Sequence, residues 1–219
     1  MNVLLNGCSF MDNTHYRDHF KQLLGATAVV NIAKPGSSNR RIIRTTVEYL
    51  ENRTVDLVVL GLTFYDRQES PLKPEQVDPW VSYNSQGMQA QFASADDFGS
   101  TAEHKLVDDY VKSRYKFDIN HHYLEQLYLD LRMLTAYLRE KKIKFCVFNT
   151  CDRHHHEVDL GPEFIPFTFI GNEFLEKNNC KPFENDIDLP ANARHYYGED
   201  VILLVAHIVE YIQRTNQIE

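Results

Sequence analysis

The sequence predicts an α/β fold: a three-layer α/β/α sandwich in which a mainly parallel, flavodoxin-like sheet of about five strands lies between helices. Short apolar runs alternate along the chain with stretches of helical periodicity, which is typical of parallel strands joined by helices. The runs are apolar throughout, as doubly buried strands tend to be. A length of 219 residues fits one domain, so we interpret residues 1–219 as a single domain.

Four runs are predicted strands, and a fifth candidate is weaker. The four runs are Val3–Asn6, Ala28–Ile32, Asp56–Leu60 and Lys144–Phe148. The fifth candidate, Phe164–Ile170, is rich in aromatic residues but is interrupted by Pro166.

Helices are predicted between and after these strands, at Tyr16–Leu24, Asn39–Glu51, Tyr123–Glu140 and Glu199–Arg214. The third of them carries leucines at three- and four-residue steps, which make one apolar stripe facing the sheet. These leucines are Leu124, Leu127, Leu131, Leu134 and Leu138. We interpret the stripe as core and not as a cofactor site.

One segment departs from the alternation. Residues from about 65 to 110 are polar and are punctuated by prolines and glycines, which predicts a long loop or lid emerging from the third strand. Loops of this length at the carboxyl edge of a sheet usually have a functional reason. We expect this segment to set specificity.

Composition and charge restrict the class of function. The formal net charge is −8 and the basic residues are dispersed, so nucleic-acid binding is not expected as the main function. No apolar run approaches the roughly 20 residues that span a bilayer, and Met1 is followed by an apolar strand without the basic region of a secretory signal. The four cysteines have neither disulfide-scaffold density nor zinc-site spacing. These features predict a cytoplasmic protein.

A serine follows the first predicted strand directly, within Gly7-Cys8-Ser9-Phe10. The carboxyl ends of parallel strands are where open α/β sheets bind ligands, so Ser9 is the first candidate for a nucleophile. A serine hydroxyl needs an adjacent base and donors for the oxyanion. The structural alternative is that small polar residues simply end the strand.

Two further stretches could supply those donors. Gly36, after the second strand, permits a tight turn and lets its N–H approach an oxyanion, while Ser38 or Asn39 can cap the next helix. After the third strand, Thr63 could donate its hydroxyl, and Arg67 could hold an anionic or polar group of the substrate. The alternatives are a plain strand-to-helix turn and, for Arg67, a solvated surface charge.

The base is predicted from Asn192-Ala193-Arg194-His195-Tyr196-Tyr197-Gly198, immediately before the last helix. Histidine titrates near neutrality, and His195 stands where the chain returns to the edge of the sheet. It is therefore a plausible general base, against the alternative of a surface histidine.

Together these stretches resemble the SGNH, or GDSL-type, hydrolases, particularly short phage and bacterial forms whose first block reads G-C-S-F. The first block is similar to Gly7–Phe10, the second to Pro35–Asn39, the third to Gly61–Thr63, and the fifth to His195. The resemblance implies a flavodoxin-like α/β/α sandwich with Ser9 as nucleophile and His195 as base. It also implies an oxyanion hole made by the backbone N–H groups of Ser9 and Gly36 and a side chain of the third block.

Two positions depart from the family pattern. The third block normally supplies an asparagine as oxyanion donor, whereas here the nearest equivalent is Thr63. The family places an aspartate three residues before the histidine, where this chain has Asn192. An amide orients imidazole but does not stabilise the imidazolium as a carboxylate does, and Asp188 is near enough in sequence to substitute.

A histidine run follows the fourth strand, in Cys151-Asp152-Arg153-His154-His155-His156-Glu157. In an extended segment His154 and His156 point to the same face and could share a metal ion. Alternatively, His154 forms one wall of the substrate pocket. We assign neither a metal nor another cofactor to the protein.

The sequence thus predicts a serine esterase or deacylase that cleaves an O-acyl ester on a carbohydrate or another small polar molecule through an acyl-enzyme. Ser9, His195, Asp188 and Asn192 are the predicted catalytic residues, and Asn39, Arg67 and His154 contact the substrate. Two alternatives remain open, a catalytically weak or inactive binding protein of the same fold and a metal-dependent hydrolase using His154–His156. The predicted partner is a small-molecule or glycan ester, neither nucleic acid nor membrane, and the oligomeric state is left open.

Overall fold

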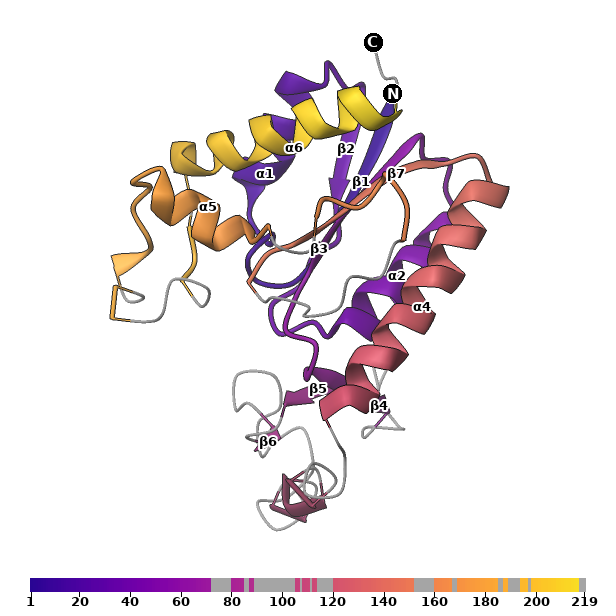
Figure 1. Cartoon of the computed structure of the whole chain (residues 1–219), viewed down its shortest axis with the longest axis vertical. Helices are drawn as coiled ribbons and strands as arrows, with labels where there is room; N and C mark the ends of the chain where they lie inside the picture. The colour runs from indigo at the N-terminus through magenta and orange to yellow at the C-terminus, as the bar shows by residue number, and fades with distance from the viewer. Residues whose placement is uncertain are drawn as a thin grey trace.

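A four-stranded parallel sheet forms the centre of the protein (Figure 1). The computed structural model describes residues 1–71, 80–84, 87–88, 105–106, 108–110, 112–113, 120–151, 160–166, 169–184, 187–188, 194–196 and 198–216. In the order β2-β1-β3-β7, the strands are Ala28–Asn31, Asn2–Asn6, Leu57–Leu62 and Lys144–Asn149. All three pairings are parallel, so the predicted strand type is confirmed.

Helices cover both faces of this sheet (Figure 1). One face packs against α1 (Thr14–Leu23), α5 (Gly171–Lys177) and α6 (Val201–Asn216). The other packs against α2 (Asn39–Leu50) and α4 (Asn120–Glu140). The predicted three-layer α/β/α arrangement is therefore confirmed.

The two cores follow the period of two along each strand, because successive strand side chains point to opposite faces. Val3 and Leu5 of β1 pack toward α1 and α6, and Leu4 between them packs toward α2 and α4. The leucine stripe predicted on α4 is buried against this second face. A fully buried Leu contributes about 1.5–3 kcal/mol relative to an exposed one, so the alternation fixes which way each strand faces.

The strand register brings the carboxyl ends of the strands to one edge. Asn6, the last residue of β1, lies opposite Leu60 of β3, and Leu62 lies opposite Asn149 of β7. The loops that follow these strands therefore meet beyond the same edge of the sheet.

The predicted fifth strand differs from the structure. Phe164–Ile170 is not a strand in its described part: only Phe164 and Ile170 make isolated parallel bridges to β7, and Pro166 between them has no N–H for a ladder. The main sheet as described thus has four strands and not five.

The segment predicted as a long loop contains strands. β4 (Gln68–Pro71), β5 (Trp80–Asn84) and β6 (Gly87–Met88) form a separate antiparallel sheet. The helix α5 was likewise not predicted. Among the described helices, none combines the length and the apolar composition needed to cross a bilayer.

Candidate active site

The turn that carries Ser9 begins directly after β1. The N–H groups of Met11 and Asp12 both donate to the carbonyl of Cys8, at 3.0 and 3.1 Å, which closes a tight turn with Ser9 near its tip. Below the turn, the Asn6 side chain accepts from the N–H of Gly7 at 2.9 Å and donates to the carbonyl of Ile42 at 2.8 Å. Hydrogen bonds of the Asn6 side chain therefore join the start of the turn to α2.

Met11 anchors the other side of the turn in a space left by two glycines. A Cβ atom on Gly7 would lie 2.8 Å from Met11 Sδ. A Cβ atom on Gly61 of β3 would overlap the same sulfur and would lie 2.7 Å from Thr150 Cγ2. Met11 is fully buried, so it has little room to move away.

We expect Gly61→Ala to lower the free energy of unfolding by about 1–3 kcal/mol, because the new methyl group overpacks the space that Met11 fills. Urea denaturation measures this value. Combining Gly61→Ala with Met11→Ala should cost less than the sum of the two single changes, since the second change makes room for the first. An unfolding free energy equal to that of the wild type would contradict this account of the packing.

His195 reaches the sheet edge through α5. The backbone N–H of Asn172, in the first turn of α5, donates to the carbonyl of Thr150 after β7 at 2.9 Å. Its side-chain amide donates to the carbonyl of Arg194 at 2.8 Å, and the carbonyl of His195 accepts from the N–H of Phe183 at 2.8 Å. Asn172 therefore links the end of β7 to the histidine segment, a role that the sequence did not reveal.

Ser9 and His195, 186 positions apart, meet at this edge. His195 Nε2 lies 2.8 Å from Ser9 Oγ, and both residues are half-buried. The distance fits donation by the serine hydroxyl to Nε2 when Nδ1 carries the ring proton. The predicted meeting of the two side chains is thus present in the structure.

The loop after β2 lies against the Ser9 turn. The N–H of Lys34 donates to the carbonyl of Gly7 at 3.3 Å, and Asn31 Nδ2 donates to the carbonyl of Met11 at 2.8 Å. These two hydrogen bonds place the loop at residues 33–38 beside the residues that flank Ser9.

Gly36 is the third residue of a turn that needs a positive φ at that position. The N–H of Ser37 donates to the carbonyl of Lys34 at 3.2 Å, Pro35 stands second in the turn, and Gly36 has a φ of 72°. A positive φ at the third position, after proline, is the signature of a type II turn. Within the described part of the chain, the N–H groups of Gly36 and Ser9 donate to no acceptor.

Thr63 and Asn39 lie beneath the site and hold each other. Asn39 Oδ1 accepts from the N–H of Thr63 at 2.8 Å, and its Nδ2 donates to the carbonyl of Thr63 at 3.0 Å. Thr63 is 0% exposed, its hydroxyl accepts from Arg67 at 3.2 Å, and it lies 3.7 Å from Cys151 Sγ. The structure therefore corrects two expectations: the hydroxyl of Thr63 is not open to a substrate, and the amide of Asn39 is occupied by backbone.

Arg67 is also buried, with 9% of its surface exposed, so it is not a solvated surface charge. Its guanidinium donates to Thr63 and to the carbonyl of Ser37, the latter at 3.4 Å, and it lies 5.4 Å from the ring centroid of Phe64. Among the described residues, no carboxylate forms a salt bridge with it. Arg67 therefore joins the loops after β2 and β3.

The positive charge of Arg67 acts on the buried thiol of Cys8. Burial opposes ionisation of this thiol, but contacts with Cys151 and Thr63, the charge of Arg67 and the N–H of Phe10 outweigh it and lower the pKa of Cys8 to about 6. Burial raises the pKa values of the other three thiols, Cys146, Cys151 and Cys180. Cys8 is thus the cysteine that ionises near neutral pH.

We expect the ultraviolet absorbance of the native protein to show one thiolate, absent below and present above a midpoint near pH 6. Cys8→Ser should remove this titration, and Arg67→Met should move its midpoint upward by about one unit, because the compensating charge is lost. Cys180→Ser is the matched control and should leave the curve unchanged. If the midpoint of the Cys8 titration were the same in Arg67→Met as in the wild type, the electrostatic account would be wrong.

Of the other predicted site residues, Asp188 is described, and it is not brought to His195. Asp188 lies in an exposed turn, and no hydrogen bond joins it to His195 among the contacts of the described residues. Asn192 and the run His154–His156 lie outside the described residues. In the described part, no group of three metal-ligating side chains occurs.

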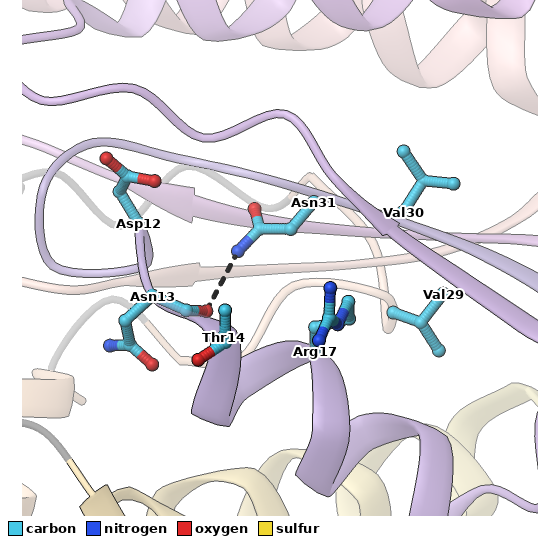
Figure 2. A pocket seen from close by; sticks show the side chains of 7 residues that line it. All are labelled: Asp12, Asn13, Thr14, Arg17, Val29, Val30 and Asn31. Carbon is cyan, nitrogen blue, oxygen red and sulfur yellow. Dashed lines mark hydrogen bonds between the residues drawn. The ribbon is translucent and has the colours of Figure 1, made fainter.

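A pocket of about 470 Å³ lies at a distinct place, between the start of α1 and the edge strand β2 (Figure 2). Asp12, Arg17 and Val30 are among its lining residues, and Asn31 crosses it to donate to the carbonyl of Asn13 at 3.4 Å. Neither Ser9 nor His195 lines this pocket. It is therefore separate from the serine–histidine pair.

Solved structures that match this chain include TesA and a GDSL-like lipase from Bacteroides thetaiotaomicron. TesA has 10% sequence identity and a TM-score of 0.45, over 98% of this chain and 97% of TesA. The lipase has 12% identity and a TM-score of 0.34, over 97% of this chain and 88% of the lipase. No protein-family model and no curated protein matches the sequence. Because the sequence identities and TM-scores are low, a function for this chain has to be inferred from its own side chains.

Proposed function

We propose that the protein is a serine hydrolase that cleaves an ester through an acyl-enzyme. The observation that carries the proposal is the 2.8 Å contact between Ser9 Oγ and His195 Nε2 at the carboxyl edge of the parallel sheet. A nucleophile within hydrogen-bond distance of a base is the arrangement that activates a serine hydroxyl.

In the proposed reaction, His195 Nε2 takes the hydroxyl proton while Ser9 Oγ attacks the acyl carbonyl. The tetrahedral intermediate collapses by breaking the ester C–O bond, and the departing oxygen takes the proton back from His195 as the alcohol leaves. A water molecule then gives a proton to His195 and attacks the acyl-enzyme. Release of the carboxylic acid returns the proton to Ser9.

The proposed oxyanion donors are the backbone N–H groups of Ser9 and Gly36. Both are free of acceptors in the described part of the chain, and the loops that carry them are hydrogen-bonded to each other. One such donor is worth about 3 kcal/mol in the transition state. Thr63 and Arg67 support this hole from below, because they hold the loops after β2 and β3 together.

The Ser9–His195 contact also favours a hydrolase over a binding protein of the same fold. Ligand binding alone does not require a base at 2.8 Å from one hydroxyl. The chain holds that base by a defined set of hydrogen bonds through Asn172 and Phe183.

For the substrate, we propose an O-acyl ester on a carbohydrate or another small polar molecule. Ser9 and His195 are half-buried, so a small polar ester reaches them from solvent more readily than a long acyl chain, which needs an apolar groove. Comparing an acetylated sugar with long-chain p-nitrophenyl esters tests this choice, and a preference for the long chains would contradict it.

A fluorophosphonate probe tests the proposed function directly. We expect stoichiometric phosphonylation of the wild-type protein, with the adduct located on Ser9 by peptide mass spectrometry, because the probe reports a nucleophilic serine. Denatured protein is the control and should not react. A folded protein that remains unlabelled would show that Ser9 is not activated, as a binding protein predicts.

A further inference from the structure

Phe10, the residue after the proposed nucleophile, lies flat against the proposed base. The ring centroids of Phe10 and His195 are 4.6 Å apart and their planes are inclined by 18°, which is a stacked arrangement. Phe10 is 6% exposed, so its ring is fixed by its surroundings. One face of the imidazole is therefore covered by a rigid aromatic surface.

We propose that Phe10 is a positioning residue for the reaction: its ring sets the plane of the His195 imidazole and favours the imidazolium that forms when Ser9 attacks. This inference rests on the proposed function and assigns a role to a residue outside the serine–histidine pair. It follows from the juxtaposition of Phe10, His195 and Ser9 at one turn.

Two contacts between described residues act on the position of the imidazole. The hydrogen bond to Ser9 fixes the distance of Nε2 from the nucleophile, and the stack on Phe10 fixes the tilt of the ring. Because Ser9 and Phe10 are consecutive, one turn supplies both the nucleophile and the surface against which its base lies. A small movement of this turn therefore carries both groups together, which keeps the reacting atoms in line.

The stack also acts on charge. A cation within about 6 Å of the face of an aromatic ring is attracted by the ring quadrupole. In the proposed reaction the imidazole takes the proton of Ser9 and becomes a cation, so this attraction is stronger in the transition state than in the state from which the attack starts. Interactions of that kind raise the rate of the chemical step.

The surroundings of Phe10 keep its ring in place. Its other partner is Phe64, at 6.4 Å and 67° in an edge-to-face contact, and Arg67 lies over the ring of Phe64. Cys8 and Cys151, both fully buried, also pack against Phe10. The row from Arg67 through Phe64 and Phe10 to His195 thus links the loops after β3 and β1 to the histidine segment.

The test compares Phe10→Leu, which keeps apolar bulk but removes the aromatic face, with Phe10→Tyr, which retains it. We expect Phe10→Leu to lower kcat for ester hydrolysis by about tenfold with KM nearly unchanged, and Phe10→Tyr to restore kcat. Phe145→Leu is the matched control, since Phe145 is equally buried in the core but remote from His195. It should keep the wild-type kcat while losing stability.

Nuclear magnetic resonance gives a second readout that a merely structural role would not move. In the wild type, the ring current of Phe10 should shift the imidazole protons of His195 upfield, and Phe10→Leu should return them to ordinary positions. A wild-type kcat in Phe10→Leu, or equal losses in the Leu and Tyr variants, would overturn the inference alone. A wild type without ester hydrolysis would overturn the proposed function and, with it, the role of Phe10 in catalysis.

Discussion

Replacing Ser9 by alanine is expected to lower kcat/KM for p-nitrophenyl acetate by about 10⁵-fold, because no other group can form the acyl-enzyme. The change removes one hydroxyl from a half-buried position and leaves the backbone turn intact. The free energy of unfolding should therefore stay within about 1 kcal/mol of the wild type. Steady-state hydrolysis measures the loss, and urea denaturation shows that the variant is folded.

Ser113→Ala serves as the control for Ser9→Ala. Its hydroxyl bonds the carbonyl of Tyr110 and makes no contact with Ser9 or His195 in the described part of the chain. This variant should hydrolyse the ester at the wild-type rate. If Ser9→Ala instead retained that rate, the nucleophile would have to be sought elsewhere and the proposed function would fail.

The central sheet could be predicted from the sequence because β1, β3 and β7 are buried on both faces, although the edge strand β2, which was also expected to be doubly buried, is partly exposed. An apolar run such as Leu57–Leu62 has no other stable place in a protein of this size, and the leucine spacing of α4 defines one buried face. The segment at Phe164–Ile170 has similar composition, but Pro166 prevents a continuous ladder and leaves two bridges. Composition alone does not show that difference.

The meeting of Ser9 and His195 could also be predicted, because both residues lie where the chain leaves the carboxyl edge of a parallel sheet. The orientation of Thr63, Asn39 and Arg67 could not. Whether a side chain after a strand turns outward to a ligand or inward to its neighbours depends on packing between loops that are distant in sequence. Here Arg67 turns inward and donates a hydrogen bond to the hydroxyl of Thr63. The side-chain amide of Asn39 donates to the backbone carbonyl of Thr63.

The stack of Phe10 on His195 and the link through Asn172 were missed for a related reason. A phenylalanine after a turn is the ordinary signal of an apolar anchor, and Phe10 is indeed buried. Its second function depends on a ring contributed from the far end of the chain. An asparagine early in a short helix likewise gives no sequence signal that it bonds the carbonyl of Arg194.

Replacing His195 by alanine is expected to lower kcat/KM by about 10⁴-fold, since Ser9 would lose the base that takes its proton. Labelling of Ser9 by a fluorophosphonate should slow to a similar extent while the adduct stays on the same residue. His122→Ala, at an exposed position of α4, is the control and should leave both rates unchanged.

Added imidazole separates loss of the base from loss of the fold in His195→Ala. The truncated side chain leaves a space bounded by the ring of Phe10 on one side and by Ser9 on another, so free imidazole can stack there and accept the proton. We expect a concentration-dependent recovery of hydrolysis in His195→Ala that does not occur in Ser9→Ala. Recovery in both variants would mean that imidazole attacks the ester itself, and a wild-type rate in His195→Ala without imidazole would place the base at another residue.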